Sequence, residues 1–60
     1  MMRVNDLIEL CKKLAGSQGF YGRLLRDLNE MDEDALAEID EAMQGANLSD
    51  ELDIIMWLEG

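Results

Sequence analysis

Apolar residues recur every three or four positions along most of this 60-residue chain, with polar and charged residues between them. This spacing places the apolar side chains on one face of an α-helix, so it predicts helices rather than strands. The first helix is predicted over 4–15, with Asn5 as its N-cap and Gly16 as the residue that ends it. Its apolar stripe consists of Val4, Leu7, Ile8, Cys11, Leu14 and Ala15.

A second helix is predicted over 18–30, with Ser17 as its N-cap. Gly19 and Gly22 fall inside it, and each costs about 1 kcal/mol relative to alanine in a helix. Close approach of a neighbouring helix would offset this cost, and a looser first turn is the alternative. The apolar stripe of this helix consists of Tyr21, Leu24, Leu25, Leu28 and Met31, with Phe20 beside it.

The third helix is predicted to begin after Asp32, which serves as its N-cap, and to end at Gly45. Glu33 and Asp34 lie in its first turn, where the helix dipole favours negative charge. The inward face of this helix is predicted to consist of Leu36, Ile39 and Met43.

A fourth helix is predicted over 50–59, with Ser49 as its N-cap. A short strand over 54–58 is the competing interpretation, because so short an apolar run does not reveal its period. We expect Trp57 to lie on the acidic side of this helix, away from the core. The inward residues are predicted to be Leu52, Ile55, Met56 and Leu58.

Together these segments predict an all-α fold, a compact domain of three or four helices spanning 1–60. A hydrophobic content of 48% favours a folded chain over a disordered one. A chain this short buries only about 60% of its surface on folding, and its single cysteine, Cys11, allows no internal disulfide. We therefore expect self-association to add stability. A small structural or assembly homo-oligomer is one alternative function.

The composition disfavours catalysis and metal binding. The chain has no histidine, so it lacks the commonest metal ligand and cannot form a Cys–His or Ser–His catalytic pair. Cys11 lies on an apolar stripe, where a buried structural thiol is expected. The acidic residues between Asp32 and Glu38 lack the spacing of a calcium-binding loop. We therefore expect no enzyme activity, no metal and no cofactor.

The chain shows no targeting or membrane-spanning pattern. Its first 13 residues have no long apolar run and no small-residue cleavage site, which disfavours a signal peptide. The longest apolar run, 54–58, is far shorter than the roughly 20 residues needed to cross a bilayer. A cytoplasmic location is therefore expected.

Charge is distributed unevenly along the chain. Residues 1–26 hold all five bases against two acids, whereas residues 27–60 hold twelve acids and no base. The first part therefore carries +3 and the second −12, which gives the whole chain its net charge of −9. Such a surface repels membranes and nucleic acid and favours basic protein partners.

The densest run of carboxylates lies between Asp27 and Glu41, and several of them stand three or four residues apart with no cation between them. Such a surface is typical of proteins that bind a basic partner, and its charge can compete with nucleic-acid phosphates for the same site. The alternative is a solvated face that keeps a small protein soluble. The candidate partner-binding residues are Glu30, Glu33, Asp34, Glu38, Glu41 and Trp57, the last as an interface anchor.

Residues 14–28 partly match a helix-turn-helix, in which Ala15 packs at the helix crossing and Gly19 makes the turn. In this alternative the chain is a DNA-binding regulator. However, Gln18 stands where the motif usually has an apolar residue, and the net charge opposes a phosphate backbone. The candidate DNA-binding residues are Tyr21, Arg23 and Arg26.

The block SQGFYGRLL over 17–25, with acidic sequence after it and DIIMWLE over 53–59, resembles small uncharacterised proteins encoded by phages and prophages of Gram-positive bacteria. The resemblance implies no activity for any single residue. It implies a context in which small acidic proteins bind host or phage machinery, as acidic anti-CRISPR proteins block a nucleic-acid channel. The leading expectation is therefore a non-enzymatic module whose acidic face engages a basic surface of a nucleic-acid-handling protein.

Overall fold

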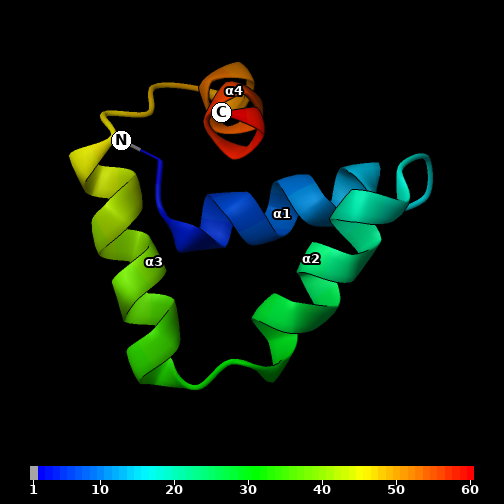
Figure 1. Ribbon diagram of the computed structural model, residues 1–60, viewed down its shortest axis with the longest axis horizontal. Coiled ribbons are helices and arrows are strands. Elements are labelled where there is room, and N and C mark those ends of the chain that lie inside the picture. The colour runs from blue at the N-terminus through cyan, green and yellow to red at the C-terminus, as the bar shows by residue number, and fades with distance from the viewer. Residues whose placement is uncertain (1) are drawn as a thin grey trace.

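The structure, a computed structural model, describes residues 2–60 as four α-helices joined by short connections (Figure 1). The helices are α1 (Val4–Leu14), α2 (Gly19–Glu30), α3 (Glu33–Gly45) and α4 (Glu51–Glu59). The prediction of an all-α fold is confirmed, and no segment of the described chain forms a strand. The competing interpretation of 54–58 as a strand is therefore wrong.

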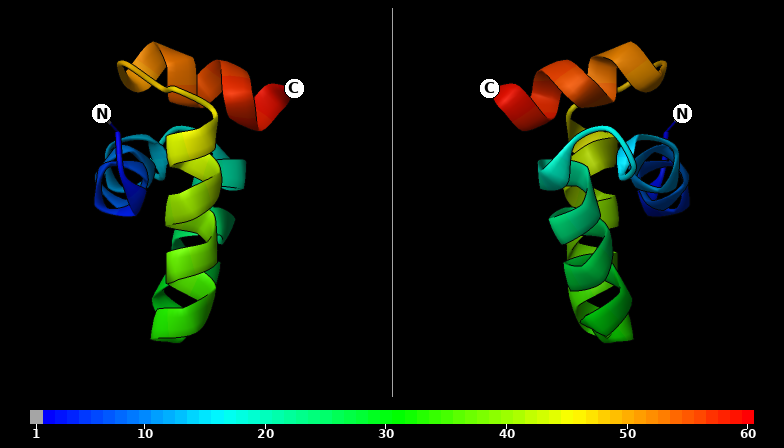
Figure 2. Two further views of the ribbon diagram at one scale, coloured as in Figure 1. Left: turned by 90° about the vertical axis from the view of Figure 1, so that its left-hand side faces the viewer. Right: turned by 90° about the vertical axis from the view of Figure 1, so that its right-hand side faces the viewer.

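Helix α1 lies at the centre of the molecule, and each of the other three helices packs against it. α2 and α3 extend below its two ends, and α4 lies across its top (Figure 1). The side views show that α4 runs crosswise to α3 (Figure 2). Within residues 2–60 the three outer helices make few contacts with one another, so α1 holds the fold together.

The core forms around α1, which contributes three of its fully buried side chains. The predicted stripe of this helix omits Leu10, which is nevertheless only 2% exposed. The physical reason is that neighbours cover α1 on three sides, so it buries a wider arc than a helix packed on one side. The buried residues are Leu7, Leu10, Cys11, Tyr21, Leu28, Met43, Leu48 and Ile54.

The predicted inward face of α4 is right for Ile55 and Leu58, which pack against the core, and wrong for Leu52 and Met56. Ile54 is completely buried, whereas Leu52 and Met56 are both 63% exposed. Trp57 is half-buried and packs against the core, although we expected it to point away. The pattern could not fix the rotation of α4, because apolar residues occur on nearly every side of this helix.

The predicted N-caps of α1 and α2 are also wrong. The first helix is capped at Arg3, whose backbone N–H donates to the Asp6 carboxylate at 2.8 Å, and not at Asn5. The N-cap position of α2 is Gln18, which makes no side-chain capping bond. The Ser17 hydroxyl instead donates to the carbonyl of Leu14 at 3.3 Å, so it closes the end of α1.

The two later helices begin at aspartates. Asp32 caps α3 as predicted, because its carboxylate accepts the backbone N–H of Ala35 at 2.9 Å. Helix α4 is capped by Asp50 rather than by Ser49: the Asp50 carboxylate accepts the N–H of Asp53 at 2.9 Å. In return the Asp53 carboxylate accepts the N–H of Ser49 at 2.9 Å. This reciprocal pair satisfies two backbone donors at the start of the helix.

The two glycines of α2 differ in their surroundings. A Cβ at Gly22 would lie 3.7 Å from the backbone oxygen of Ala15 and 3.9 Å from its Cβ, so α1 and α2 approach closely there. A Cβ at Gly19 would have no atom within 4 Å. The predicted offset of the glycine cost by close packing therefore applies to Gly22 and not to Gly19.

Replacing Gly19 with alanine is expected to raise the free energy of unfolding by about 0.5–1 kcal/mol. The new methyl group meets open space, and the backbone at Gly19 has no positive φ that an alanine would resist. The measurement is the urea midpoint of unfolding. A midpoint below that of the unchanged chain would contradict the open surroundings of this position.

Candidate functional site

Three carboxylates form a straight row on the outward side of α3. Asp34, Glu38 and Glu41 are spaced i, i+4 and i+7, which places them within an arc of about 60° around the helix axis. All three are exposed, and they lie opposite the side on which Met43 is buried. We call these three residues the acidic stripe. Glu33 is also exposed and flanks the stripe at the first turn.

The cations of the described chain pair elsewhere or lie on other helices. Three ion pairs join Arg3 to Asp40 at 2.6 Å, Lys12 to Glu9 at 3.5 Å and Lys13 to Glu51 at 2.7 Å. In residues 2–60 no base lies within ion-pair distance of the acidic stripe. The negative charge of the stripe is therefore not neutralised by these cations.

Asp40 belongs to the same acidic run of sequence but turns inward, with its side chain only 14% exposed. Its two carboxylate oxygens share the single N–H of Arg3 Nε, each at 2.9 Å, and one of them also accepts from Arg3 Nη2 at 2.6 Å. It also accepts the backbone N–H of Val4 at 2.9 Å and Gln44 Nε2 at 3.1 Å. These bonds tie the start of α1 to α3 and so fix the helix that carries the stripe.

The same contacts perturb the ionisation of Asp40. Hydrogen bonds from the Arg3 side chain, and then from the backbone of Val4, lower the pKa of Asp40 from 3.8 to about 2. Both partners favour the ionised carboxylate. The group therefore stays charged throughout the range in which ordinary carboxylates titrate.

Replacing Asp40 with asparagine is expected to lower the urea midpoint at neutral pH. Because the pKa of this carboxyl is lower in the folded chain, its ionisation stabilises folding fully above about pH 4. This contribution is lost as the pH falls toward 2. The difference in urea midpoint between the variant and the unchanged chain should therefore shrink as the pH falls from about 4 to about 2. Glu41→Gln is the control, since its carboxylate is exposed on the stripe. A difference in urea midpoint that does not change with pH would contradict the stabilising contact of Asp40 with Arg3 and Val4.

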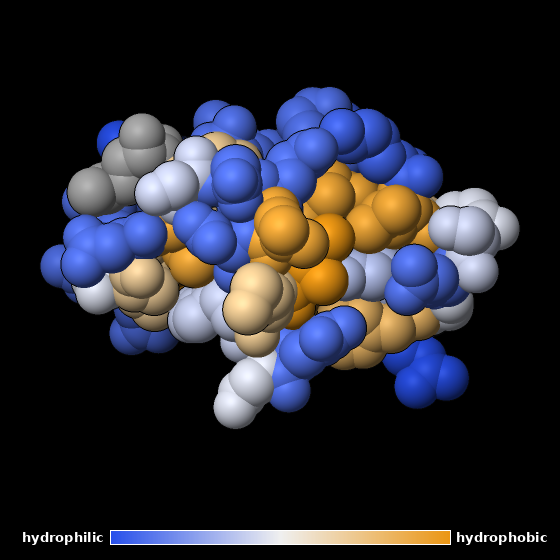
Figure 3. Space-filling model, turned by 90° about the horizontal axis from the view of Figure 1, so that it is seen from above, coloured by the Kyte–Doolittle hydropathy of each residue, from blue (hydrophilic) through white to orange (hydrophobic). Residues whose placement is uncertain are grey.

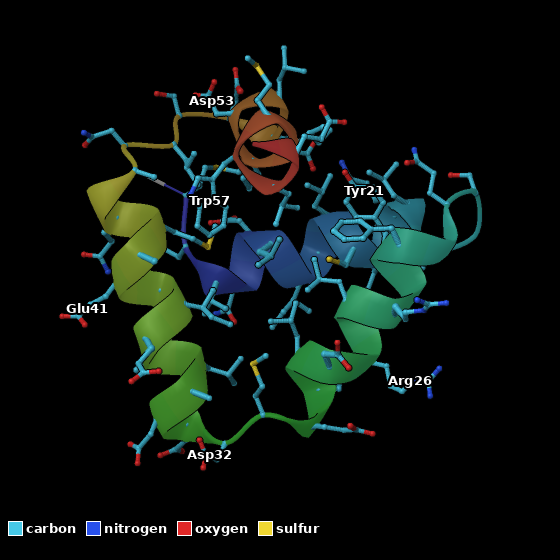
Figure 4. All side chains as sticks on the ribbon, viewed as in Figure 1. Tyr21, Arg26, Asp32, Glu41, Asp53 and Trp57 are labelled. Atoms are coloured by element: carbon cyan, nitrogen blue, oxygen red, sulfur yellow. The ribbon has the colours of Figure 1, made fainter. Side chains whose placement is uncertain are left out.

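The other predicted partner-binding residues lie apart from the stripe. Glu30 is exposed at the last position of α2, close to the corner where α2 leads into Asp32 and α3. Trp57 lies beside α4 and packs against the core, whereas Glu41 points away from the body on the outer side of α3 (Figure 4). The structure therefore does not bring Trp57 and the carboxylates into one site.

The candidate DNA-binding residues do not form one surface either. Tyr21 is only 4% exposed, and its ring packs edge-on against Phe20 with the centroids 5.2 Å apart. The expectation that Tyr21 points outward to DNA is therefore wrong. Arg23 and Arg26 are exposed on α2, and Arg26 points away from the molecule (Figure 4). Gly19 is the first residue of α2, so it does not make the turn that a helix-turn-helix requires.

The sequence analysis missed an exposed apolar surface on α4. Leu52 and Met56 stand one turn apart on the outer side of this helix, each 63% exposed. The molecule seen from the α4 side shows apolar atoms gathered in the middle of this face, with hydrophilic residues around them (Figure 3). The available signal was composition: a helix that is apolar on all sides cannot be covered by a single neighbour.

The described residues, 2–60, show neither a pocket nor a group of three acidic or cysteine side chains placed to hold a metal ion. Cys11 is buried, and burial raises the pKa of its thiol, which disfavours the reactive thiolate. In the same range no helix has the length and apolar character needed to cross a membrane.

Comparisons of the chain with protein-family models, with curated proteins and with solved structures each found no match.

Proposed function

We propose that this protein is a non-enzymatic binding module whose acidic stripe engages a basic surface of a nucleic-acid-handling protein. The observation that carries the proposal is the outward row of Asp34, Glu38 and Glu41, which has no ion-pair partner within the described residues. Like charges three or four residues apart destabilise a helix slightly. A partner that supplies Lys or Arg would relieve this repulsion on binding.

The charge spacing supports a partner that normally holds nucleic acid. From Glu33 to Glu41 the helix rises about 12 Å, and four exposed carboxylates lie along it. This is about one charge every 4 Å of helix axis, close to the roughly 3.4 Å of duplex axis per phosphate of one DNA strand. Basic side chains arranged for a phosphate backbone could therefore pair with successive carboxylates. Binding there would block the nucleic acid, so the module would act as an inhibitor.

The anchoring of α3 at Asp32 and Asp40 also supports this function. The helix is capped by Asp32 and tied to α1 through Asp40, so the carboxylates are held in a fixed row before any partner arrives. A preorganised surface loses less conformational entropy on binding than a flexible acidic tail. The function therefore depends on the fold and not only on the composition.

The experiment is an affinity capture of the tagged chain from a nuclease-treated lysate of a Gram-positive bacterium. A basic nucleic-acid-binding protein should be recovered at low salt and lost at high salt, because exposed charges are screened. Added duplex DNA should also release it, since both ligands would use the same basic residues. A captured partner that resists both salt and DNA would contradict the proposal.

A further inference from the structure

Helix α4 has an uncovered apolar side. Ile54 is completely buried on its inner side, and the Lys13–Glu51 ion pair holds the helix against α1. Leu52 and Met56 are spaced i and i+4 on the outer side, so their exposed side chains adjoin. We call these two residues the α4 ridge.

Acidic side chains surround the α4 ridge. Asp50 and Asp53 lie at the start of the helix and Glu59 at its end. From residue 27 to the end of the printed sequence there is no base. Lys13, the base attached to this helix, already pairs with Glu51 at 2.7 Å. The ridge is therefore an apolar strip with a negatively charged rim.

This rim argues against a second copy of the chain as the partner. A symmetric dimer places the same patch of both copies face to face, and here it would bring two negatively charged rims together. Such juxtaposed like charges oppose association. A partner with the opposite rim charge gains both the apolar contact and the charge attraction.

We propose that the α4 ridge binds an amphipathic helix of another protein, in which Lys or Arg residues flank an apolar stripe. An apolar face laid along an apolar strip is an established mode of helix recognition. Met56 suits this role because its unbranched, flexible side chain adapts to different partners. The contact is separate from the acidic stripe, which lies on α3, so the two surfaces can act on different parts of one partner.

The test uses a fluorescently labelled synthetic peptide of leucine and lysine, with the leucines on one face of a helix. A second peptide has the same composition but leucines scattered around the helix. Fluorescence anisotropy is measured with the full chain, with Leu52→Ser/Met56→Ser, and with Phe20→Ser as the matched control. Phe20 is an apolar residue of α2 and is 56% exposed, so it tests the loss of exposed apolar surface away from the ridge.

The amphipathic peptide should bind about tenfold more tightly than the scattered one, because its leucine face buries more of the Leu52 and Met56 side chains. The double variant should lose this preference, and Phe20→Ser should keep it. Equal affinity for both peptides, or an unchanged double variant, would overturn the proposal. So would sedimentation showing a dimer that only the double variant dissociates, because a second copy would then cover the ridge. Lysate capture that is unchanged when the acidic stripe is neutralised, together with an intact peptide preference, would contradict the proposed function and leave the ridge proposal standing.

Discussion

Replacing Ile54 with alanine is expected to lower the free energy of unfolding by about 2–5 kcal/mol, the usual cost of truncating a large side chain in a packed core. Ile54 is the one fully buried side chain of α4. Since a domain of this size has only a few kcal/mol of stability, much of the variant should be unfolded at room temperature. Urea unfolding followed by far-ultraviolet circular dichroism measures the loss.

The matched control lies on the same helix. Met56→Ala removes a side chain that is 63% exposed, so it should change the free energy of unfolding by less than about 0.5 kcal/mol. The sequence pattern predicts the reverse order, with Met56 inward. A larger loss for Met56→Ala than for Ile54→Ala would therefore mean that α4 is rotated relative to the structure.

Neutralising the acidic stripe is expected to weaken binding of a basic partner about tenfold. The variant combines Asp34→Asn, Glu38→Gln and Glu41→Gln. Each exposed ion pair contributes about 0.2–1 kcal/mol, and about 1.4 kcal/mol in total corresponds to a factor of ten. The fold should be kept, because all three side chains are exposed and take no part in the hydrogen bonds of the described residues. The measurement is a titration of the captured partner at fixed low salt.

A control with the same net charge separates a specific stripe from general attraction. Glu9→Gln, Asp27→Asn and Asn29→Lys change the net charge by the same three units at exposed positions of α1 and α2, away from the stripe and from the α4 ridge. This control should retain most of the affinity. If both triple variants lose affinity equally, the partner responds to total charge, and α3 has no special role.

The sequence predicted the first three helices well because their apolar stripes have a clear period, whereas α4 is apolar on nearly every side and its rotation was mispredicted. The N-caps were mispredicted where two neighbouring polar residues could each cap the helix. Asn5 and Ser49 are good capping residues, but the neighbouring backbone was closed by Asp6 and Asp50 instead. A cap depends on which residue first leaves the helical conformation, and several polar residues in a row make that choice ambiguous.

The acidic stripe was predictable, whereas the role of Asp40 was not. Once Met43 is assigned to the core, the helical period alone places Asp34, Glu38 and Glu41 on the far side. The pairing of Asp40 with Arg3 joins residues 37 positions apart, and no local pattern reveals such a contact. The charge pattern therefore overstated the number of free carboxylates on α3.

The buried position of Cys11 means that the reaction of its thiol can report how often the fold opens. This thiol is completely buried in α1, the helix against which the other three pack. Reagents such as disulfide exchangers reach it only when that packing separates, so the rate of labelling follows the open population and not the exposure of the surface. With one cysteine in 60 residues, each molecule gives a single signal. Stability could therefore be followed on the purified chain with a thiol reagent, without any engineered label, both alone and with a cysteine-free partner bound.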